Sequence, residues 1–121
     1  MSIDISKFSF KNNLWECIFP WQSSLRIFVD GDEDYFKDPA NVESLELLMQ
    51  ELDKEVFRAI DFAMKSAYRT DITRSPDMQL SIVHVKAWND YRIWFSLSCD
   101  TGKKLAVDII NSKAVDVYCD H

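Results

Sequence analysis

The sequence predicts an α+β fold, in which an antiparallel meander sheet of about six to seven strands packs against one long amphipathic helix. Short segments with apolar residues at every second position occupy both ends of the 121-residue chain, as in half-buried strands. Between them, from about residue 42 to residue 68, apolar residues keep the i, i+3, i+4 spacing of a helix. We expect a single domain over residues 1–121, which is close to the commonest domain size.

The first strands are expected at residues 8–11, 14–19 and 25–29, where apolar and polar residues alternate. The pair Asn12-Asn13 favours a tight turn between the first two strands. Pro20 ends the second strand. The third strand leads directly into residues 30–34, which we call the acidic turn.

The long helix is expected to begin near Asp38-Pro39, because an acidic capping residue before a proline is typical of a helix N-terminus. Asn41 is the alternative cap. Acidic residues cluster early in the helical segment and basic residues late, which the helix dipole favours. At about 1.5 Å per residue, a helix from 42 to 68 would be about 40 Å long.

Four further strands are expected to form a meander after the helix, at residues 80–87, 93–99, 105–109 and 115–119. The apolar positions change parity between Ile82 and Val83, which predicts either a β-bulge or a strand covered on both faces. Turns are expected at Asn89-Asp90, at residues 100–103 and at Asn111-Ser112.

Composition excludes several classes of protein. No apolar run approaches the roughly 18–20 residues of a membrane span, and the first residues lack the pattern of a secretory signal. Three scattered cysteines, Cys17, Cys99 and Cys119, do not make a disulfide framework. We therefore expect free thiols, a cytoplasmic location, no membrane partner, and a monomer or weak dimer.

The distribution of charge is the most informative feature. Residues 30–55 carry ten acids and two bases, a charge of −8 against −6 for the whole chain. The helix cap and dipole account for the acids from Asp38 onward. They do not account for the acidic turn, where Asp30, Asp32, Glu33 and Asp34 crowd like charges. Such a turn is either merely solvated or neutralised by a basic partner, and we favour the second.

The acidic turn does not match a calcium-binding EF-hand loop. Counted from Asp30, loop positions six and twelve require Gly and Glu, but they hold Tyr35 and Asn41. A loosely held cation is a minor alternative. We predict no metal and no cofactor.

Catalytic interpretations rest on few residues. Cys119 and His121 could join another cysteine around zinc, but the close Cys-x₂₋₄-Cys pairs of structural sites are missing. Cys99 and His84 could form a nucleophilic dyad, yet Cys99 continues an apolar strand face, as a buried thiol does. A lone histidine within a strand is typically a hydrogen-bonded structural residue. We predict that the protein is not an enzyme; a small enzyme with carboxylate or Cys/His chemistry is an alternative.

Bases and aromatic residues occur together around one expected hairpin, at Lys86, Trp88, Tyr91, Arg92 and Trp94. This mixture can stack on single-stranded nucleic acid, but the acidic net charge disfavours phosphate contacts. We therefore expect no nucleic-acid partner. The two tryptophans either anchor a protein partner or cover the second face of the sheet.

A short acidic α+β chain with Trp15-Glu16 in an early strand, an Asp-rich turn, a long amphipathic helix and a closing meander resembles bacterial immunity proteins. These are the antidotes of contact-dependent inhibition and other polymorphic toxin systems. The resemblance lies in size, charge and element order. It implies an inhibitory protein that neutralises a cognate toxin domain, often a basic nuclease, through an acidic surface.

A structural or oligomerisation module is the main alternative. For the immunity-type function, the partner-binding residues that we predict are Asp30, Asp32, Glu33, Asp34, Tyr35, Phe36, Glu43, Glu46, Trp88 and Trp94.

Overall fold

The structure is a computed structural model that describes residues 4–18, 25–99 and 102–120. The strands of its sheet are β1 (Ser9–Lys11), β2 (Leu14–Ile18), β3 (Arg26–Asp30), β4 (Gln79–Ala87), β5 (Asp90–Ser96), β6 (Lys104–Ile110) and β7 (Lys113–Asp120). The helices are α1 (Pro39–Gln50), α2 (Leu52–Met64) and α3 (Arg69–Thr73), and the 3₁₀ turns are η1 (Ile5–Lys7) and η2 (Tyr35–Lys37). The expected strand end at Phe19-Pro20, half of the expected turn at 100–103, and His121 lie outside the described residues.

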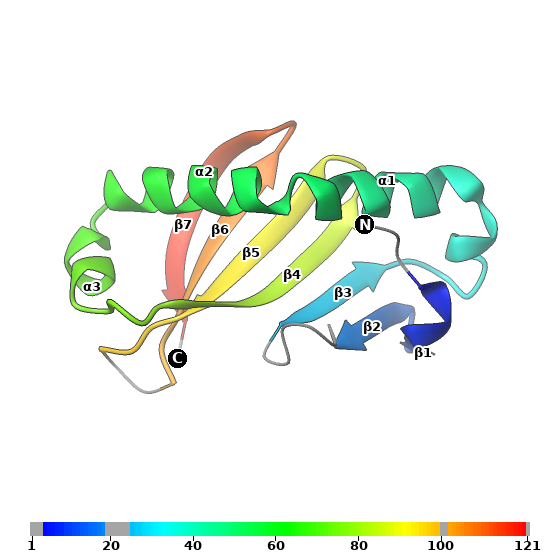
Figure 1. Cartoon of the computed structure of the whole chain (residues 1–121), viewed down its shortest axis with the longest axis horizontal. Helices are drawn as coiled ribbons and strands as arrows, with labels where there is room; N and C mark the ends of the chain where they lie inside the picture. Colours follow the sequence, from blue (N-terminus) through cyan, green and yellow to red (C-terminus); the bar gives the residue numbers. More distant parts are fainter. Residues whose placement is uncertain (1–3, 19–24, 100–101, 121) are drawn as a thin grey trace.

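The strands form one seven-stranded sheet in which they lie in sequence order, so the predicted α+β meander is confirmed. Neighbouring strands are antiparallel except for β3 and β4, which run parallel with Arg26 opposite Ile82. A parallel pair needs a crossover connection, and the helical segment between β3 and β4 provides it (Figure 1).

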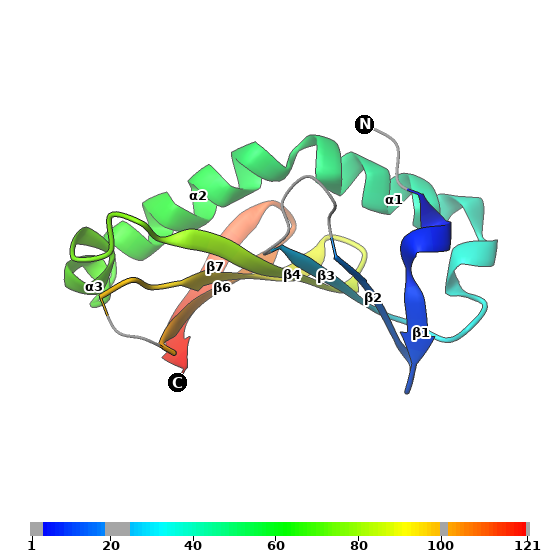
Figure 2. The same cartoon turned by 60° about the horizontal axis from the view of Figure 1, so that its bottom comes forward.

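The helices cover one face of the sheet and leave the other uncovered (Figure 2). Because side chains alternate along a strand, each row of paired residues belongs to one face. Ile27, Val83, Ile93 and Val107 are paired in a row beneath the helices and are fully buried. The next row belongs to the uncovered face, which we call the open face: Glu16, Phe28, His84, Arg92, Asp108 and Asp116.

Asparagines make the tight turns of the meander. Asn12 and Asn13 both have positive φ, as do Asn111 and Ser112, and Asn89 has φ 56°. Paired residues with positive φ match the right-handed twist of a two-residue hairpin. The turns predicted at Asn12-Asn13 and Asn111-Ser112 are confirmed. The turn predicted at Asn89-Asp90 lies one residue earlier, at Trp88-Asn89, because Asp90 already pairs with Ala87 as the first residue of β5. The register of β4 against β5 shifts between Leu80 and Ile82, which agrees with a bulge, the first of the two alternatives predicted from the change of parity.

The prediction of one uninterrupted helix over residues 42–68 is wrong. Asp38 caps α1 by accepting the Ala40 N–H at 2.9 Å, so helix begins at Pro39. At Glu51 the backbone leaves helical geometry, with φ −96° and ψ 7°. Helix resumes as α2, and the two helices follow one another over the curved sheet (Figure 2). The spacing of apolar residues does not reveal this break. Only Glu51 separates the two helices, so the buried stripe continues from one helix to the next.

A second break ends α2 at Met64. The Ser66 hydroxyl donates to the Ala63 carbonyl and accepts the Tyr68 N–H, which replaces helical hydrogen bonds with local ones. The chain then turns into the short α3 before entering β4. In α2, the fully buried Ala59 and Ala63 bring the helix backbone close to the sheet.

Candidate functional site

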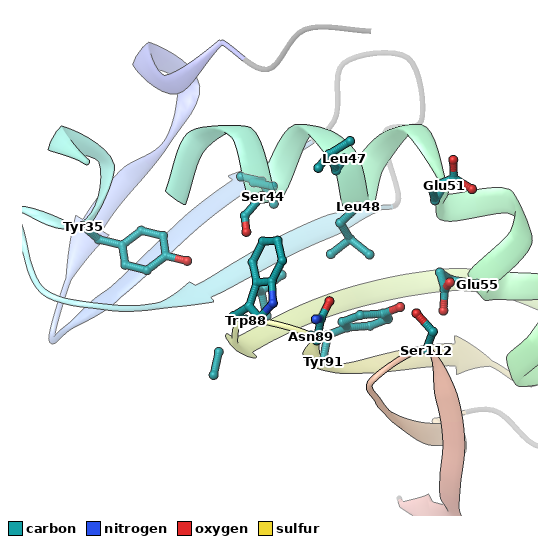
Figure 3. A pocket seen from close by; sticks show the side chains of 13 residues that line it. Tyr35, Ser44, Leu47, Leu48, Glu51, Glu55, Trp88, Asn89, Tyr91 and Ser112 are labelled. Atoms are coloured by element: carbon teal, nitrogen blue, oxygen red, sulfur yellow. The ribbon is translucent and has the colours of Figure 1, made fainter. Parts of the chain in front are cut away.

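A cleft of about 310 Å³ lies between the helical layer and the turns that join β4 to β5 and β6 to β7 (Figure 3). We refer to it as the cleft. Helix α1 supplies Ser44, Leu47 and Leu48 to its lining, α2 supplies Glu55, and Glu51 lies at the junction of the two helices. The sheet side supplies Val85, Trp88, Asn89, Tyr91 and Ser112, and Tyr35 of η2 lies at one end.

Two exposed apolar side chains mark the mouth of the cleft. Trp88 is 67% exposed and Leu47 is 47% exposed. Trp88 occupies the turn between β4 and β5, and its indole points up toward α1 (Figure 3). The positive φ of Asn89 sets this tight turn and so holds Trp88 outside the sheet.

A buried acid forms the inner end of the cleft. Glu55 is only 6% exposed, and its Oε1 accepts a hydrogen bond from Arg58 at 2.6 Å, one turn further along α2. Its Oε2 is buried and accepts no hydrogen bond within the described part of the chain. The hydroxyl of Tyr91 points toward this carboxylate (Figure 3). Burial raises the pKa of the Tyr91 phenol, and so does the Glu55 carboxylate, both as a hydrogen-bond acceptor for that hydroxyl and through its charge. The geometry of this contact falls short of a hydrogen bond to Oε2.

The acidic turn is more structural than its sequence indicates. Asp30 lies 2.8 Å from Nε2 of His84 on the open face, and Asp34 pairs with Lys37 at 2.7 Å. The carboxylate of Asp32 accepts the Asp34 N–H, which closes a local turn. Only Glu33 of these four acids makes no hydrogen bond or ion pair to a described residue. We predict that all four acids contact a partner. At Asp30, Asp32 and Asp34 an interaction within the chain gives a second reason for the acid.

Tyr35 and Phe36 belong to an aromatic cluster that anchors the acidic turn. Phe36 lies 5.1 Å from Phe8 and 5.0 Å from Trp15, between ring centroids. The Trp15 indole N–H donates to the Asp32 carbonyl at 2.9 Å. Phe36 is thus committed to packing, whereas Tyr35 also lines the cleft.

The structure separates the other predicted partner-binding residues. Glu43 precedes Leu47 by one turn and lies on the cleft side of α1, while helical periodicity places Glu46 on the opposite flank. Trp88 lies at the cleft, but Trp94 belongs to the open face. The predicted residues therefore do not form one surface.

Trp94 takes part in a cation–π group on the open face. The guanidinium of Arg92 lies 5.9 Å from the Trp94 ring and 5.2 Å from the Tyr118 ring, and the two rings meet edge to face. Trp94 thus covers the second face of the sheet, which was one of the two roles considered for it.

The alternative of a Cys99–His84 dyad does not fit the structure, because Cys99 packs against the core whereas His84 lies on the open face. His84 contacts Asp30 on the open face. The thiol of Cys99 donates to the Asp71 carbonyl, and its N–H donates to the Ser75 hydroxyl. Within residues 4–18, 25–99 and 102–120, no three His, Cys, Asp or Glu side chains gather as metal ligands would.

Sequence reasoning missed the central residues of the cleft. In the sequence, Glu55 is one of several acids in a helical segment. Leu47 does not belong to the apolar stripe that predicts this helix. The one available signal was this apolar residue on the polar side of an amphipathic helix. Tyr91 gave no signal of its contact with Glu55, since the two are far apart in sequence.

In the described part of the chain, no helix combines the length and the apolar character needed to cross a membrane. Comparison with models of protein families, with curated protein sequences and with solved structures finds no match to this chain. The geometry of the cleft and its surroundings therefore carries the functional argument.

Proposed function

We propose that this protein is an inhibitory binding protein of the immunity type, which neutralises a basic toxin domain by docking through the cleft and the acids around it. The observation that carries the proposal is the exposure of Trp88 and Leu47 at the mouth of one concave site. Single exposed apolar residues are ordinary on protein surfaces. Two that border the same cleft form a ready anchor site, and Trp is among the residues that dominate interface energetics.

The charge near the cleft supports a basic partner. The lining contains Glu51 and Glu55 and, among the described residues, no lysine or arginine; the bases that pair with these acids, Lys54 and Arg58, lie outside it. Glu43 lies just outside the lining, and the acidic turn precedes Tyr35 at its far end. A surface of one sign accelerates the encounter with a partner of the opposite sign. Rapid capture is what an antidote requires.

The first test measures association with the purified toxin domain that co-purifies with the chain from its native host. The triple variant Asp32→Asn, Glu33→Gln, Asp34→Asn should slow association by about ten-fold or more at low salt. Asparagine at position 32 keeps the acceptor oxygen that closes the turn. The matched control Glu16→Gln, Asp77→Asn, Asp116→Asn removes the same charge away from the cleft and should change the rate less than about two-fold. Equal rates for the two triple variants would remove the acidic turn from the interface.

The second test concerns the apolar anchor. Trp88→Ala should raise the dissociation rate by about ten-fold or more, because it truncates an aromatic residue that docking would bury. Phe57→Ala is the control, since Phe57 is 75% exposed on α2 and does not line the cleft. Growth of cells that express both toxin and variant gives the functional readout. Full protection by Trp88→Ala with an unaltered dissociation rate would contradict docking at the cleft.

A second candidate function is self-association through the β7 edge of the sheet. Val115 on this terminal strand is 51% exposed, and an unpaired edge can accept another strand. Light scattering after size exclusion gives the mass directly. A dimer that Val115→Lys dissociates would support this candidate, and a monomer at about 0.1 mM would exclude it.

A further inference from the structure

The Glu55 carboxylate has an acceptor to spare inside the cleft. Arg58 uses Oε1, while Oε2 is buried and receives no hydrogen bond from a described residue. A buried charged acceptor without a donor is costly, and a donor supplied from outside would recover that cost. The side chain is more than nine-tenths buried and lines the cleft, so an incoming group can reach this acceptor only through the cleft.

The lining matches a long side chain with a cationic end. Leu47, Leu48 and the indole of Trp88 form apolar walls near the mouth, and the acids Glu51 and Glu55 come from the helical side (Figure 3). The side chains of lysine and arginine match this lining. Each has an aliphatic stem, which suits the apolar walls, and ends in a charged group that only donates hydrogen bonds, which suits the acids. The face of Trp88 adds a favourable cation–π surface.

The size of the cleft limits its occupant. Small-molecule sites in proteins usually measure about 300–1,000 Å³, and the cleft, at about 310 Å³, is at the lower end of that range. One extended side chain fits such a volume better than a cofactor does. Glu51 lies nearer solvent and pairs with Lys54 at 2.9 Å, so Glu55 is the more desolvated of the two acids.

We propose that the cleft receives one lysine or arginine side chain of the partner, whose cationic group donates a hydrogen bond to Oε2 of Glu55 while its stem packs between Trp88 and the leucines of α1. This inference rests on the proposed function, because it names the chemistry with which a basic partner enters the same site. Under this proposal, Glu55 selects for a lysine or arginine at one position of the partner, whereas the other acids attract a basic partner in general.

The test uses the whole chain and small probes, without a partner. The full-length protein is titrated with n-butylammonium, n-propylguanidinium and the neutral 1-pentanol, and binding is followed through the NMR signal of the Trp88 indole N–H. The two cations should give saturable shifts with dissociation constants in the millimolar range, as weak fragments do. 1-Pentanol should bind at least about five-fold more weakly, because it offers a donor without charge.

Variants then assign the binding to Glu55. Glu55→Gln should weaken cation binding at least about five-fold, whereas Glu16→Gln removes the same charge on the open face, away from the cleft, and should change it less than about two-fold. Equal binding of cations and 1-pentanol overturns the proposal. So does unchanged binding to Glu55→Gln. The comparison of charged with neutral probes needs no variant, so it decides the matter even where Glu55→Gln fails to fold.

Tyr91 offers an internal competitor for Oε2, because its hydroxyl points toward the same carboxylate. Cation binding to Tyr91→Phe but not to the unaltered chain would show that the tyrosine occupies this acceptor, and would overturn the proposal. The two proposals fail separately. If the cationic probes do not bind, but the acidic-turn variant still associates more slowly with the toxin domain, the proposed function stands. Only the cationic side chain in the cleft is then overturned.

Discussion

Arg92 donates from Nε to Oδ1 of Asp108 at 2.6 Å, across neighbouring strands of the open face. Both side chains are mostly buried although no helix covers this face, because Trp94 and Tyr118 flank the guanidinium. Hydrogen bonds between charged groups of this kind contribute more than exposed ion pairs do.

Asp108→Asn should lower the free energy of unfolding by about 1–2 kcal/mol, because the amide keeps the shape but loses the charge that Arg92 faces. Urea unfolding monitored by circular dichroism measures the change. Asp116→Asn provides the control, since this exposed neighbour accepts, from the residues that the structure describes, only the Val117 N–H. Its effect should stay within about 0.5 kcal/mol. If both variants lost the same free energy of unfolding, the Arg92–Asp108 pair would contribute no more to stability than an exposed carboxylate does.

Ala59 is fully buried where α2 approaches the sheet. Ala59→Leu adds volume at a closely packed point and should cost about 1–3 kcal/mol of unfolding free energy. Ala40→Leu makes the same chemical change at an exposed position of α1 and should be nearly neutral. Thermal or urea unfolding compares the two. If Ala59→Leu left the free energy of unfolding unchanged, the helical layer would be able to move away from the sheet at no cost in stability.

Gly31 lies against the ring of Tyr35. A Cβ at position 31 would lie 2.6 Å from Cδ2 and 2.9 Å from Cβ of that tyrosine. Gly31→Ala should therefore displace Tyr35, with a stability loss of about 1–2 kcal/mol, and shift the Tyr35 ring signals in NMR spectra. Gly102→Ala meets open space, although its φ of +87° is strained for alanine. It should destabilise the protein without moving the Tyr35 signals.

Stability should fall at alkaline pH, in part through Tyr91. Burial and the Glu55 carboxylate raise the pKa of this phenol above its usual value of 10.0. The unfolded chain then releases its proton near pH 10 while the folded chain retains it, so the contribution is complete below pH 10 and is lost as the pH rises further. Tyr91→Phe should flatten this decline between about pH 9.5 and 11. Urea midpoints measured across that range check it, and an identical decline in the variant would assign the effect to other groups.

Local patterns allowed most of the strands to be predicted. Alternating apolar residues located the strands, and Asn12-Asn13 and Asn111-Ser112 located two of the turns, because both signals are encoded within a few neighbouring residues. The change of apolar phase near Ile82 even indicated the bulge. The break at Glu51 has no such signal, since it contains neither proline nor glycine.

The candidate site depended on contacts that no local pattern encodes. The sequence offers both Trp88 and Trp94 as anchors. They separate because Trp88 lies in the β4–β5 turn while Trp94 lies within β5 on the open face, and only the strand ends and the register decide this. The acidic turn was identified by charge, yet its pairing of Asp30 with His84 depends on the parallel neighbour β4. Glu55 became distinctive only when the fold buried it.

The parallel pairing of β3 with β4 joins Arg26 to Ile82, 56 positions apart, whereas the other ladders join strands that are separated by short connections. Closing such a long connection costs more entropy than closing a hairpin, and distant pairings slow folding. The chain should therefore assemble two local meanders first, β1–β3 and β4–β7, and join them late. Because the cleft takes residues from α1, the β4–β5 turn and η2, a newly made chain would gain its binding surface only at this last step.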